Sequence, residues 1–251
     1  MKDKVILITG ANTGIGLETA KRFLIAGSKV IINYIDNEQS ISNLLKSLNK
    51  EGHNGKVIAI KADVSIEEER KFLIKSALEQ LKKIDILINN AGITNTEFDF
   101  FNISLAGFKE TIAVNLEAPI FLSKLFADEL IKRKQAGCII NIASVAGHRA
   151  NENVHYGASK AALINATKTM ARKLAKYSIR VNSVSPGFVL TEMSAEWKKN
   201  NIEAWDRILK EIPMGCAAEP RSVANAIFFL ASDDSNMTTG IDFPIDGGFL
   251  S

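Results

Sequence analysis

Short apolar runs of strand length alternate with helix-periodic segments along almost the whole of the 251-residue chain. The runs are nearly continuous rather than alternating in polarity, which is typical of strands buried on both faces of a sheet. They cover residues 5–9, 30–34, 57–60, 84–89, 138–143, 179–184 and 241–245. Such strands separated by helices predict an α/β fold, a doubly wound parallel sheet of about seven strands with helices on both faces and right-handed crossovers.

The intervals between the runs carry the predicted helices, because their apolar residues recur at helical spacing. They cover residues 15–26, 38–48, 65–81, 104–133, 156–175 and 220–230. Ser65 and Glu68 have the spacing of a capping box, and Pro220 suits a first helical turn. The length fits one domain spanning residues 1–251 better than two ordinary domains.

The connection at residues 190–214 is longer than an ordinary link between a strand and a helix. Long connections of this kind are usually functional, so we expect a helical lid over a substrate site. The segment carries Met193, Trp197 and Trp205. These side chains either line an apolar substrate pocket or form a small core of the lid itself.

Composition excludes several classes of function. A net charge of +3, from 31 basic and 28 acidic residues, argues against a nucleic-acid surface, and no apolar run has the ~20 residues of a membrane span. Cys138 and Cys216 do not make a disulfide framework, so we expect a reducing cytoplasm. His53, His148 and His155 lack metal-ligand spacing, so we expect no metal site.

A glycine-rich turn at residues 9–16 follows the first strand and opens the first helix. Glycine allows positive φ and close approach of a pyrophosphate, and a helix N-terminus offers free N–H groups to an anion. In this position the turn predicts a dinucleotide site rather than a purely structural turn. The residues expected to bind are Gly10, Asn12, Thr13, Gly14, Ile15 and Gly16.

The end of the second strand is where the adenine ribose is expected. An acidic residue there would bind the 2′-hydroxyl of NAD(H), but Tyr34 occupies the position and Asp36 comes two residues later. No basic residue for the 2′-phosphate of NADP(H) follows, so the choice stays open, with the missing acid leaning toward NADP(H). After the third strand, Asp63 and Val64 are candidates to contact adenine, although Asp63 could instead cap a turn.

Tyr156 and Lys160 lie four residues apart, and Ser144 lies twelve residues before Tyr156. On a helix, residues at this spacing share a face. An ammonium beside a phenol favours the phenolate and lowers its pKa from the usual value near ~10, which makes it a general acid or base. A tyrosine and a lysine four residues apart are also common on protein surfaces. The catalytic interpretation of Tyr156 and Lys160 therefore depends on the other motifs of the chain.

Asn115 precedes Pro119 by four residues within a predicted helix. Proline has no N–H, so the backbone carbonyl of Asn115 lacks its i+4 donor and the helix should kink. A free carbonyl there could hold a water that links Lys160 to solvent as a proton relay. The alternative is a buried asparagine beside a structural kink.

These motifs together resemble the short-chain dehydrogenase/reductase family over essentially the full chain. Residues 9–16 look like its cofactor loop, and residues 89–92 like the motif that closes the fourth strand against that loop. Within the family, residues 212–215 and 246–248 resemble 3-oxoacyl-acyl-carrier-protein reductases and glucose 1-dehydrogenases. The remaining matches are the catalytic set Asn115, Ser144, Tyr156 and Lys160, and the nicotinamide-side motif Pro186, Gly187 and Thr191.

The resemblance implies a single-domain Rossmann-type enzyme that transfers hydride between NAD(P)(H) and a carbonyl or secondary alcohol. Tyr156 would exchange the proton, Lys160 would lower its pKa and hold the nicotinamide ribose, and Ser144 would hydrogen-bond the substrate oxygen. A homotetramer is also implied. The other residues expected to bind the cofactor are Tyr34, Asp63, Val64, Asn90, Ala91, Gly92, Pro186, Gly187, Val189 and Thr191.

Three functions remain open from the sequence. The first is reduction of a 3-oxoacyl thioester, possibly carried on acyl carrier protein, and the second is oxidation of a sugar or polyol. The third is a regulator that binds the dinucleotide without turnover, against which the Ser144–Tyr156–Lys160 set argues. Between Ser144 and Tyr156, His155 is either a general base or a solvated loop histidine, and Arg149 either attracts an anionic group or is only solvated.

Overall fold

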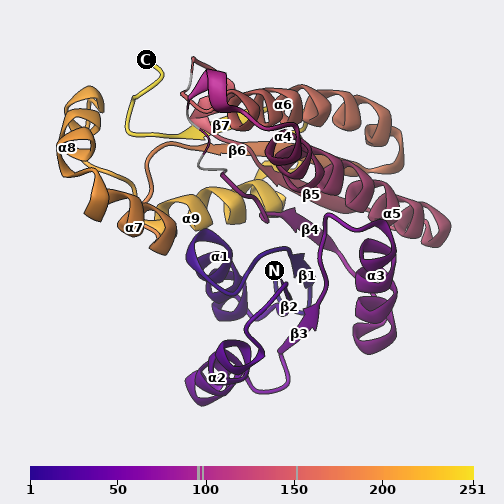
Figure 1. Cartoon of the computed structure of the whole chain (residues 1–251). Coiled ribbons are helices and arrows are strands. Elements are labelled where there is room, and N and C mark those ends of the chain that lie inside the picture. The colour runs from indigo at the N-terminus through magenta and orange to yellow at the C-terminus, as the bar shows by residue number, and fades with distance from the viewer. Residues whose placement is uncertain (95–96, 98, 151) are drawn as a thin grey trace.

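The strands among the described residues form one seven-stranded parallel sheet in the order β3-β2-β1-β4-β5-β6-β7 (Figure 1). The computed structural model describes residues 1–94, 97, 99–150 and 152–251, without the side chains of residues 193, 196, 197 and 200. The strands are β1 Val5–Ile8, β2 Lys29–Tyr34, β3 Val57–Lys61, β4 Ile86–Asn89, β5 Gly137–Ile142, β6 Ile179–Pro186 and β7 Asp242–Ile245. The predicted doubly wound sheet is confirmed.

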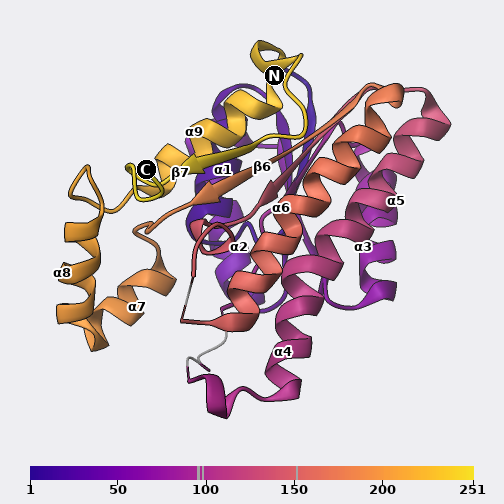
Figure 2. The same ribbon diagram turned by 90° about the horizontal axis from the view of Figure 1, so that it is seen from above.

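Helices cover both faces of the sheet (Figures 1 and 2). One layer consists of α1 Gly14–Ile25, α2 Glu38–Leu48 and α9 Pro220–Ala231. The other consists of α3 Glu67–Leu81, α5 Ala118–Arg133 and α6 Val154–Leu174, and α4 Leu105–Ile112 leads into α5. The expected lid is two helices, α7 Glu192–Asn200 and α8 Ile202–Glu211, which lie beyond the arrowheads of β6 and β7 in Figure 2.

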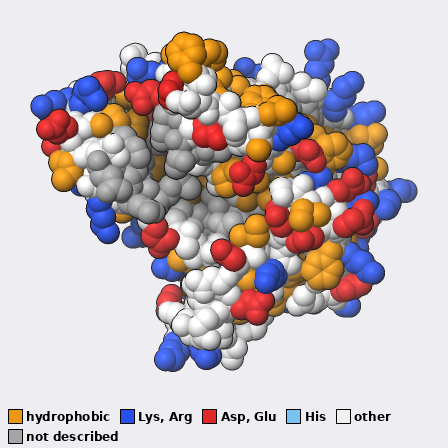
Figure 3. All heavy atoms as spheres, in the orientation of Figure 1, with side chains coloured by type: hydrophobic (Ala, Val, Ile, Leu, Met, Phe, Trp, Pro, Cys, Tyr) orange, Lys and Arg blue, Asp and Glu red, His pale blue; other side chains and the backbone are white. Residues whose placement is uncertain are grey.

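The outer surface of α3 and α5 carries intermixed acidic and basic side chains (Figure 3). On α3, Lys71 pairs with Glu67 at 2.8 Å and with Glu68 at 2.7 Å. On α5, Lys124 pairs with Asp128 at 2.9 Å. Exposed pairs of this kind contribute only about 0–1 kcal/mol each, so the stability of this layer comes from its inner side.

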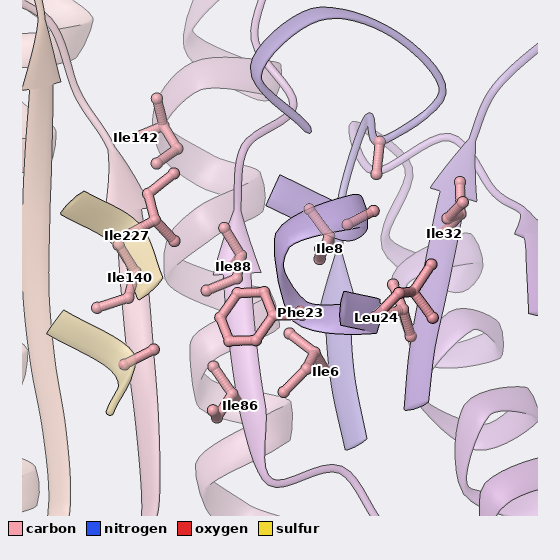
Figure 4. Packing of buried hydrophobic residues seen from close by; sticks show 14 of the residues in the cluster. Ile6, Ile8, Phe23, Leu24, Ile32, Ile86, Ile88, Ile140, Ile142 and Ile227 are labelled. Carbon is pink, nitrogen blue, oxygen red and sulfur yellow. The ribbon is translucent and has the colours of Figure 1, made fainter. Parts of the chain in front are cut away.

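Apolar side chains fill both sides of the sheet. Phe23 of α1 and Ile227 of α9 pack with Ile88 of β4 in one cluster (Figure 4). The adjacent Leu87 points to the other face, where it joins Phe126 of α5 in a second cluster. Burying each such side chain stabilises the fold by about 1.5–3 kcal/mol. Two covered faces explain why the strands read as continuous apolar runs.

The start of α3 differs from the prediction. The helix begins at Glu67, and its preceding residue Ile66 makes no side-chain cap. The Ser65 hydroxyl donates instead to the Asp63 carboxylate at 2.7 Å, and the same carboxylate oxygen accepts the Ser65 N–H at 2.8 Å. The predicted capping box is therefore wrong, because a carboxylate two residues earlier is the stronger local acceptor.

The lid is anchored through Trp205 of α8. This side chain is 2% exposed and meets Phe188 edge-on, with ring centroids 6.4 Å apart. Phe188 also meets Phe249 of the C-terminal segment edge-on at 5.6 Å. Trp205 is therefore a packing residue of a small core rather than part of the lining of a substrate pocket. The side chains of Met193 and Trp197 lie outside the described residues.

Candidate active site

The carboxyl ends of the central strands bring the predicted site segments to one edge of the sheet. The strand order reverses at β1, which has β2 on one side and β4 on the other. Dinucleotides bind at such switch points in open parallel sheets. Here the glycine-rich turn follows β1, residues 90–92 follow β4, Ser144 follows β5 and residues 187–191 follow β6.

The glycines of the turn are required by backbone conformation or by close packing. Gly10 and Gly14 have φ of +57° and +53°. A Cβ atom at Gly16 would lie 2.5 Å from the Gly10 carbonyl oxygen and 2.6 Å from Asn90 Nδ2. Thr13, at the N-cap of α1, makes no side-chain cap, so the first N–H groups of the helix are free for an anion. These residues fit a pyrophosphate.

Thr9 and Asn90 hold the turn against the end of β4. The Thr9 hydroxyl accepts the N–H groups of Asn90 and Ala91, each at 3.0 Å. Asn90 Nδ2 donates to the Thr9 carbonyl at 2.9 Å and to the Gly10 carbonyl at 2.8 Å. Asn90 therefore shapes the turn through its side chain. The sequence interpretation missed the role of Thr9, although a polar residue ending an apolar strand was the available signal.

Asn33 is a second residue that the sequence interpretation missed. It is 2% exposed at the end of β2. Its Oδ1 accepts the Gly10 N–H at 3.4 Å, and its Nδ2 donates to the Ala62 carbonyl at 2.9 Å. The glycine-rich turn is thus tied to β2 and β3 as well as to β4.

The expected adenine edge lies at the ends of β2 and β3. Tyr34 is half-buried against the core, and Asp36 is exposed. The Asp63 carboxylate caps its own turn through Ser65, and the Asp63 N–H donates to the Glu69 carboxylate. The capping alternative for Asp63 is therefore confirmed, whereas contact with adenine stays a prediction.

Tyr156, Ser144 and Lys160 come together as predicted. Asn153 Oδ1 accepts the Tyr156 N–H at 2.9 Å and caps α6, which puts Tyr156 and Lys160 one helical turn apart. The Lys160 Nζ lies 5.7 Å from the centroid of the Tyr156 ring. Ser144, at the end of β5, is hydrogen-bonded to the Tyr156 side chain. A phenol, a hydroxyl and an amine thus share one site.

The pKa shifts differ from the sequence prediction. Burial raises the pKa of Tyr156, and the hydrogen bond with Ser144 opposes that shift only in part. Burial also lowers the pKa of Lys160 to about 8. Lys160 Nζ donates to the Ile142 carbonyl at 2.8 Å. The pKa of Tyr156 is therefore raised, not lowered as expected: burial is the larger cause, and the opposing effect comes from Ser144 rather than from Lys160.

Asn115 is fully buried, and its side chain ties three segments together. Its Oδ1 accepts the Ile93 N–H at 2.9 Å, and its Nδ2 donates to the Ile93 carbonyl at 2.9 Å and to Ser159 Oγ at 3.2 Å. A Cβ at Gly92 would lie 3.3 Å from Asn115 Oδ1 and 3.4 Å from Lys160 Nζ. Gly92, Asn115 and Lys160 therefore converge without room for a side chain between them.

The backbone stays helical through Asn115, in agreement with the predicted helical stretch 104–133, but its hydrogen-bond pattern changes there. A π-helical turn, Ala113–Glu117, joins α4 to α5. Within it the Ala118 N–H donates to the Ala113 carbonyl, five residues back. Pro119 offers no N–H to the Asn115 carbonyl. Such turns occur often at functional sites; a water relay through this carbonyl remains a prediction.

The segment after β6 closes the site from the lid side. A Cβ at Gly187 would lie 2.9 Å from the Cα of Asp246, so only glycine fits. Thr191 caps α7, and its Cγ2 would lie 3.4 Å from a Cβ at Gly14, so the base of the lid lies against the glycine-rich turn. Pro186 ends β6. The Val189 side chain is 7% exposed within the core, so only its backbone is available to a cofactor.

Of His148, Arg149 and His155, which lie between Ser144 and Tyr156, only His155 is buried, whereas His148 and Arg149 are exposed but have partners. His155 lies in the first turn of α6 and is fully buried, so its interpretation as a solvated loop histidine is wrong. Arg149 lies over the Phe249 ring at 4.4 Å, with its Nη2 3.9 Å from Glu211. His148 Nε2 is 2.7 Å from the Asp242 carboxylate. The local sequence did not predict Glu211, Asp242 and Phe249 as partners because they lie far away, in the C-terminal part of the chain.

Two searches over the described ranges gave negative results. No helix there is both long and apolar enough to cross a bilayer. In the same part of the chain, no three histidine, cysteine, aspartate or glutamate side chains are grouped so that they could bind a metal ion.

Comparisons with known proteins cover nearly the whole chain. A family model described as enoyl-(acyl carrier protein) reductase matches residues 10–250. A 3-oxoacyl-acyl-carrier-protein reductase of Synechocystis sp. is 36% identical over 249 residues, covering 98% of this chain and 97% of that protein. Glucose 1-dehydrogenase 2 of Bacillus subtilis is 32% identical over 246 residues, covering 98% and 94%.

A solved structure of 4-hydroxyisoleucine dehydrogenase complexed with NADH is 37% identical to this chain. It has a TM-score of 0.89, and the match covers 98% of each chain. The range matched by the family model, residues 10–250, contains Gly10–Gly16 of the glycine-rich turn as well as Ser144, Tyr156 and Lys160. The chain therefore belongs to the short-chain dehydrogenase/reductase family, whose members are oxidoreductases that bind NAD(P)(H).

Proposed function

We propose that this chain reduces the carbonyl group of a 3-oxoacyl thioester, carried on acyl carrier protein, to a secondary alcohol with NADPH. The convergence of Tyr156, Ser144 and Lys160 beside Gly92 carries the chemical part of the proposal. The similarity to the Synechocystis 3-oxoacyl-acyl-carrier-protein reductase supports the substrate class. The Bacillus subtilis glucose 1-dehydrogenase keeps sugar oxidation as the second candidate.

Each side chain has a distinct role in this proposal. When bound, the dinucleotide supplies the hydride. The turn around Gly10, Gly14 and Gly16 holds its pyrophosphate. The Tyr156 hydroxyl donates a proton to the substrate oxygen, and the Ser144 hydroxyl hydrogen-bonds that oxygen as negative charge develops on it.

The pKa shifts favour reduction. A raised pKa keeps the Tyr156 phenol protonated at neutral pH, and the protonated phenol is the form that can donate to a carbonyl oxygen. A pKa of about 8 leaves Lys160 mostly charged at pH 7, so its ammonium stabilises the phenolate that remains after donation. Lys160 would then pass its proton to the phenolate, and a water held by the Asn115 carbonyl would return a proton from solvent to Lys160.

A substrate panel tests the proposal. Acetoacetyl thioester with NADPH or NADH, and glucose with NAD or NADP, are followed by absorbance at about 340 nm. We expect oxidation of NADPH by the thioester to be the fastest reaction. Turnover of glucose alone would favour the second candidate. Tight dinucleotide binding with no turnover of any ketone, thioester or sugar would favour a regulator.

Lys61 adds support for NADP(H). Along the chain no basic residue follows Tyr34, but the parallel register of β2 and β3 puts Lys61 opposite Tyr34. Its Nζ lies 3.0 Å from the exposed Glu38 carboxylate, and the hydrogen bond with Glu38 raises the pKa of Lys61. An exposed ammonium at this edge is suited to a 2′-phosphate.

Replacing Lys61 with methionine is expected to lower the preference for NADPH over NADH about fivefold, since one phosphate contact is worth about 1 kcal/mol. Steady-state kinetics with both dinucleotides measure the ratio. Lys56→Met, at the exposed residue just before the same strand, is the control and should leave the ratio unchanged. An unchanged ratio in Lys61→Met would remove Lys61 as the phosphate ligand.

Gly10→Ala tests the glycine-rich turn. The new Cβ would lie 3.0 Å from the Cα of Ala91, so the turn must shift, and we expect the dissociation constant for the dinucleotide to rise at least about tenfold. Gly55→Ala is a matched control, because Gly55 also has positive φ, +71°, but has nothing within 4 Å of the new Cβ. Equal binding by both variants, measured by calorimetric titration, would contradict the proposed cradle.

We further propose a homotetramer in the cytoplasm. Family resemblance supports the tetramer, and the two cysteines, Cys138 buried and Cys216 exposed, are both free. Light scattering after size-exclusion chromatography would give about four times the 27.4 kDa chain mass. A monomeric mass at micromolar concentration would contradict the assembly.

A further inference from the structure

Arg70 is a buried cation on the inner side of α3. It is 2% exposed, although arginine is almost never fully buried unless it is paired. Its position continues the apolar stripe formed by Leu73, Ile74 and Ala77, the other buried residues of α3. An arginine in a stripe that faces the core needs partners that satisfy its guanidinium group.

Those partners belong to two separate parts of the site. Arg70 Nη1 donates to the Val64 carbonyl at 2.7 Å. Arg70 Nη2 donates to Glu117 Oε1 at 2.8 Å, and the guanidinium lies 5.6 Å from the centroid of the Phe121 ring. Val64 follows β3 at the expected adenine edge, whereas Glu117 ends the π-helical turn that carries Asn115.

The neighbouring Glu69 completes the arrangement at the adenine edge. Its carboxylate accepts the Asp63 N–H, while Arg70 takes the Val64 carbonyl. Consecutive side chains of α3 therefore hold both backbone ends of the Asp63–Val64 pair. Without them the Asp63–Val64 pair would keep the bonds of its own turn, in which Ser65 donates to the Asp63 carboxylate and the Ile66 N–H donates to the Asp63 carbonyl.

We infer that Arg70 is a positioning residue for dinucleotide binding, which fixes the Asp63–Val64 edge relative to the π-helical turn Ala113–Glu117. The inference rests on the proposed function, because it needs the dinucleotide to use this edge. Arginine suits the task because its planar group donates in two directions at once, whereas a lysine ammonium offers only a point charge.

Lys71 supplies the matched control. It lies one residue later on α3, carries the same charge and pairs with Glu67 and Glu68, but its side chain is 48% exposed. Its partners belong to its own helix. Removing Lys71 changes the net charge as much as removing Arg70, without breaking a link between two segments.

The experiment compares Arg70→Met, Arg70→Lys and Lys71→Met in three measurements. These are the dissociation constant for NADPH by calorimetry, the kcat and KM for the carbonyl substrate, and hydrogen exchange of the backbone amides. We expect Arg70→Met to raise the dissociation constant about tenfold and Arg70→Lys about threefold. Exchange should accelerate at residues 62–65 and 113–117, while Lys71→Met matches the wild type.

The outcomes separate the two proposals. If the wild-type chain binds neither dinucleotide, the proposed function fails. If the wild type binds but the Arg70 variants bind equally well, the positioning role fails, even where their melting temperature is lower. If Arg70→Met does not fold, Arg70→Lys and Glu117→Gln test the positioning role instead. The role requires both variants to raise the dissociation constant for NADPH. It also requires the KM for the carbonyl substrate to stay within about twofold of the wild-type value.

Discussion

Replacing Tyr156 with phenylalanine is expected to lower kcat for carbonyl reduction about 10³-fold, within the range of about 10²–10⁴ for loss of a general acid. The ring and its packing remain, but the hydroxyl, which bonds Ser144 and is the proposed proton donor, is gone. Dinucleotide affinity should change less than about threefold, since the glycine-rich turn is untouched. Single-turnover kinetics measure the first effect and calorimetric titration the second.

Tyr177→Phe is the control for this experiment. Tyr177 lies just after α6, is 40% exposed and is remote in sequence from Ser144, so its hydroxyl should be dispensable. If Tyr156→Phe kept the wild-type kcat, Tyr156 would not be the proton donor. A wild-type chain that bound the dinucleotide but turned over no substrate would instead support the regulator interpretation.

Replacing Lys160 with methionine is expected to abolish most activity and yet stabilise the folded chain at pH 7. Burial lowers the pKa of Lys160 from 10.5 to about 8. Below pH 8 the folded chain therefore contains a buried ammonium, which destabilises it relative to the unfolded chain. The shift corresponds to about 3 kcal/mol of unfolding free energy. Loss of the bond to the Ile142 carbonyl offsets part of this, which leaves a net gain of about 1–2 kcal/mol.

The effect of pH on this variant has a defined sign. Between pH 8 and 10.5 the unfolded wild type binds more protons than the folded form, so the wild-type unfolding free energy rises with pH across this window. The advantage of Lys160→Met should therefore shrink from pH 8 upward. Urea unfolding of both proteins at several pH values measures it. Lys168→Met, an exposed position on the same helix, should show no such trend. A loss of stability in Lys160→Met that is independent of pH would refute this account.

Continuous apolar runs were the part of the sequence that predicted the fold best. Ile86, Leu87 and Ile88 occupy successive positions of β4 and alternate between two buried clusters, so no polar position marks either face. The helix at 38–48 was predicted to the residue from its apolar positions, and in the structure Asn37 caps its start by accepting the Ser40 N–H.

Sequence was weaker where partners come from distant segments. Ser65 had the right spacing for a capping box, but Asp63 competes for it in the folded chain. His155 appeared solvated because the start of α6 was predicted too late to include it. The direction of the Tyr156 pKa shift depended on burial, which a motif of two residues cannot report. Arg70 was missed because its proposed role depends on its hydrogen bonds to both Val64 and Glu117, which lie in different segments.

The π-helical turn before α5 contains one residue more than an α-helix would need for the same turn. A chain shorter by one residue in this turn would regain ordinary spacing, and α4 would then rotate by about 100° around its axis relative to α5. Every side chain from Ser104 to Ile112 would face a new direction, while Pro119 and all that follows stayed in place. The one extra residue in the π-helical turn therefore determines which side of α4 faces the rest of the molecule.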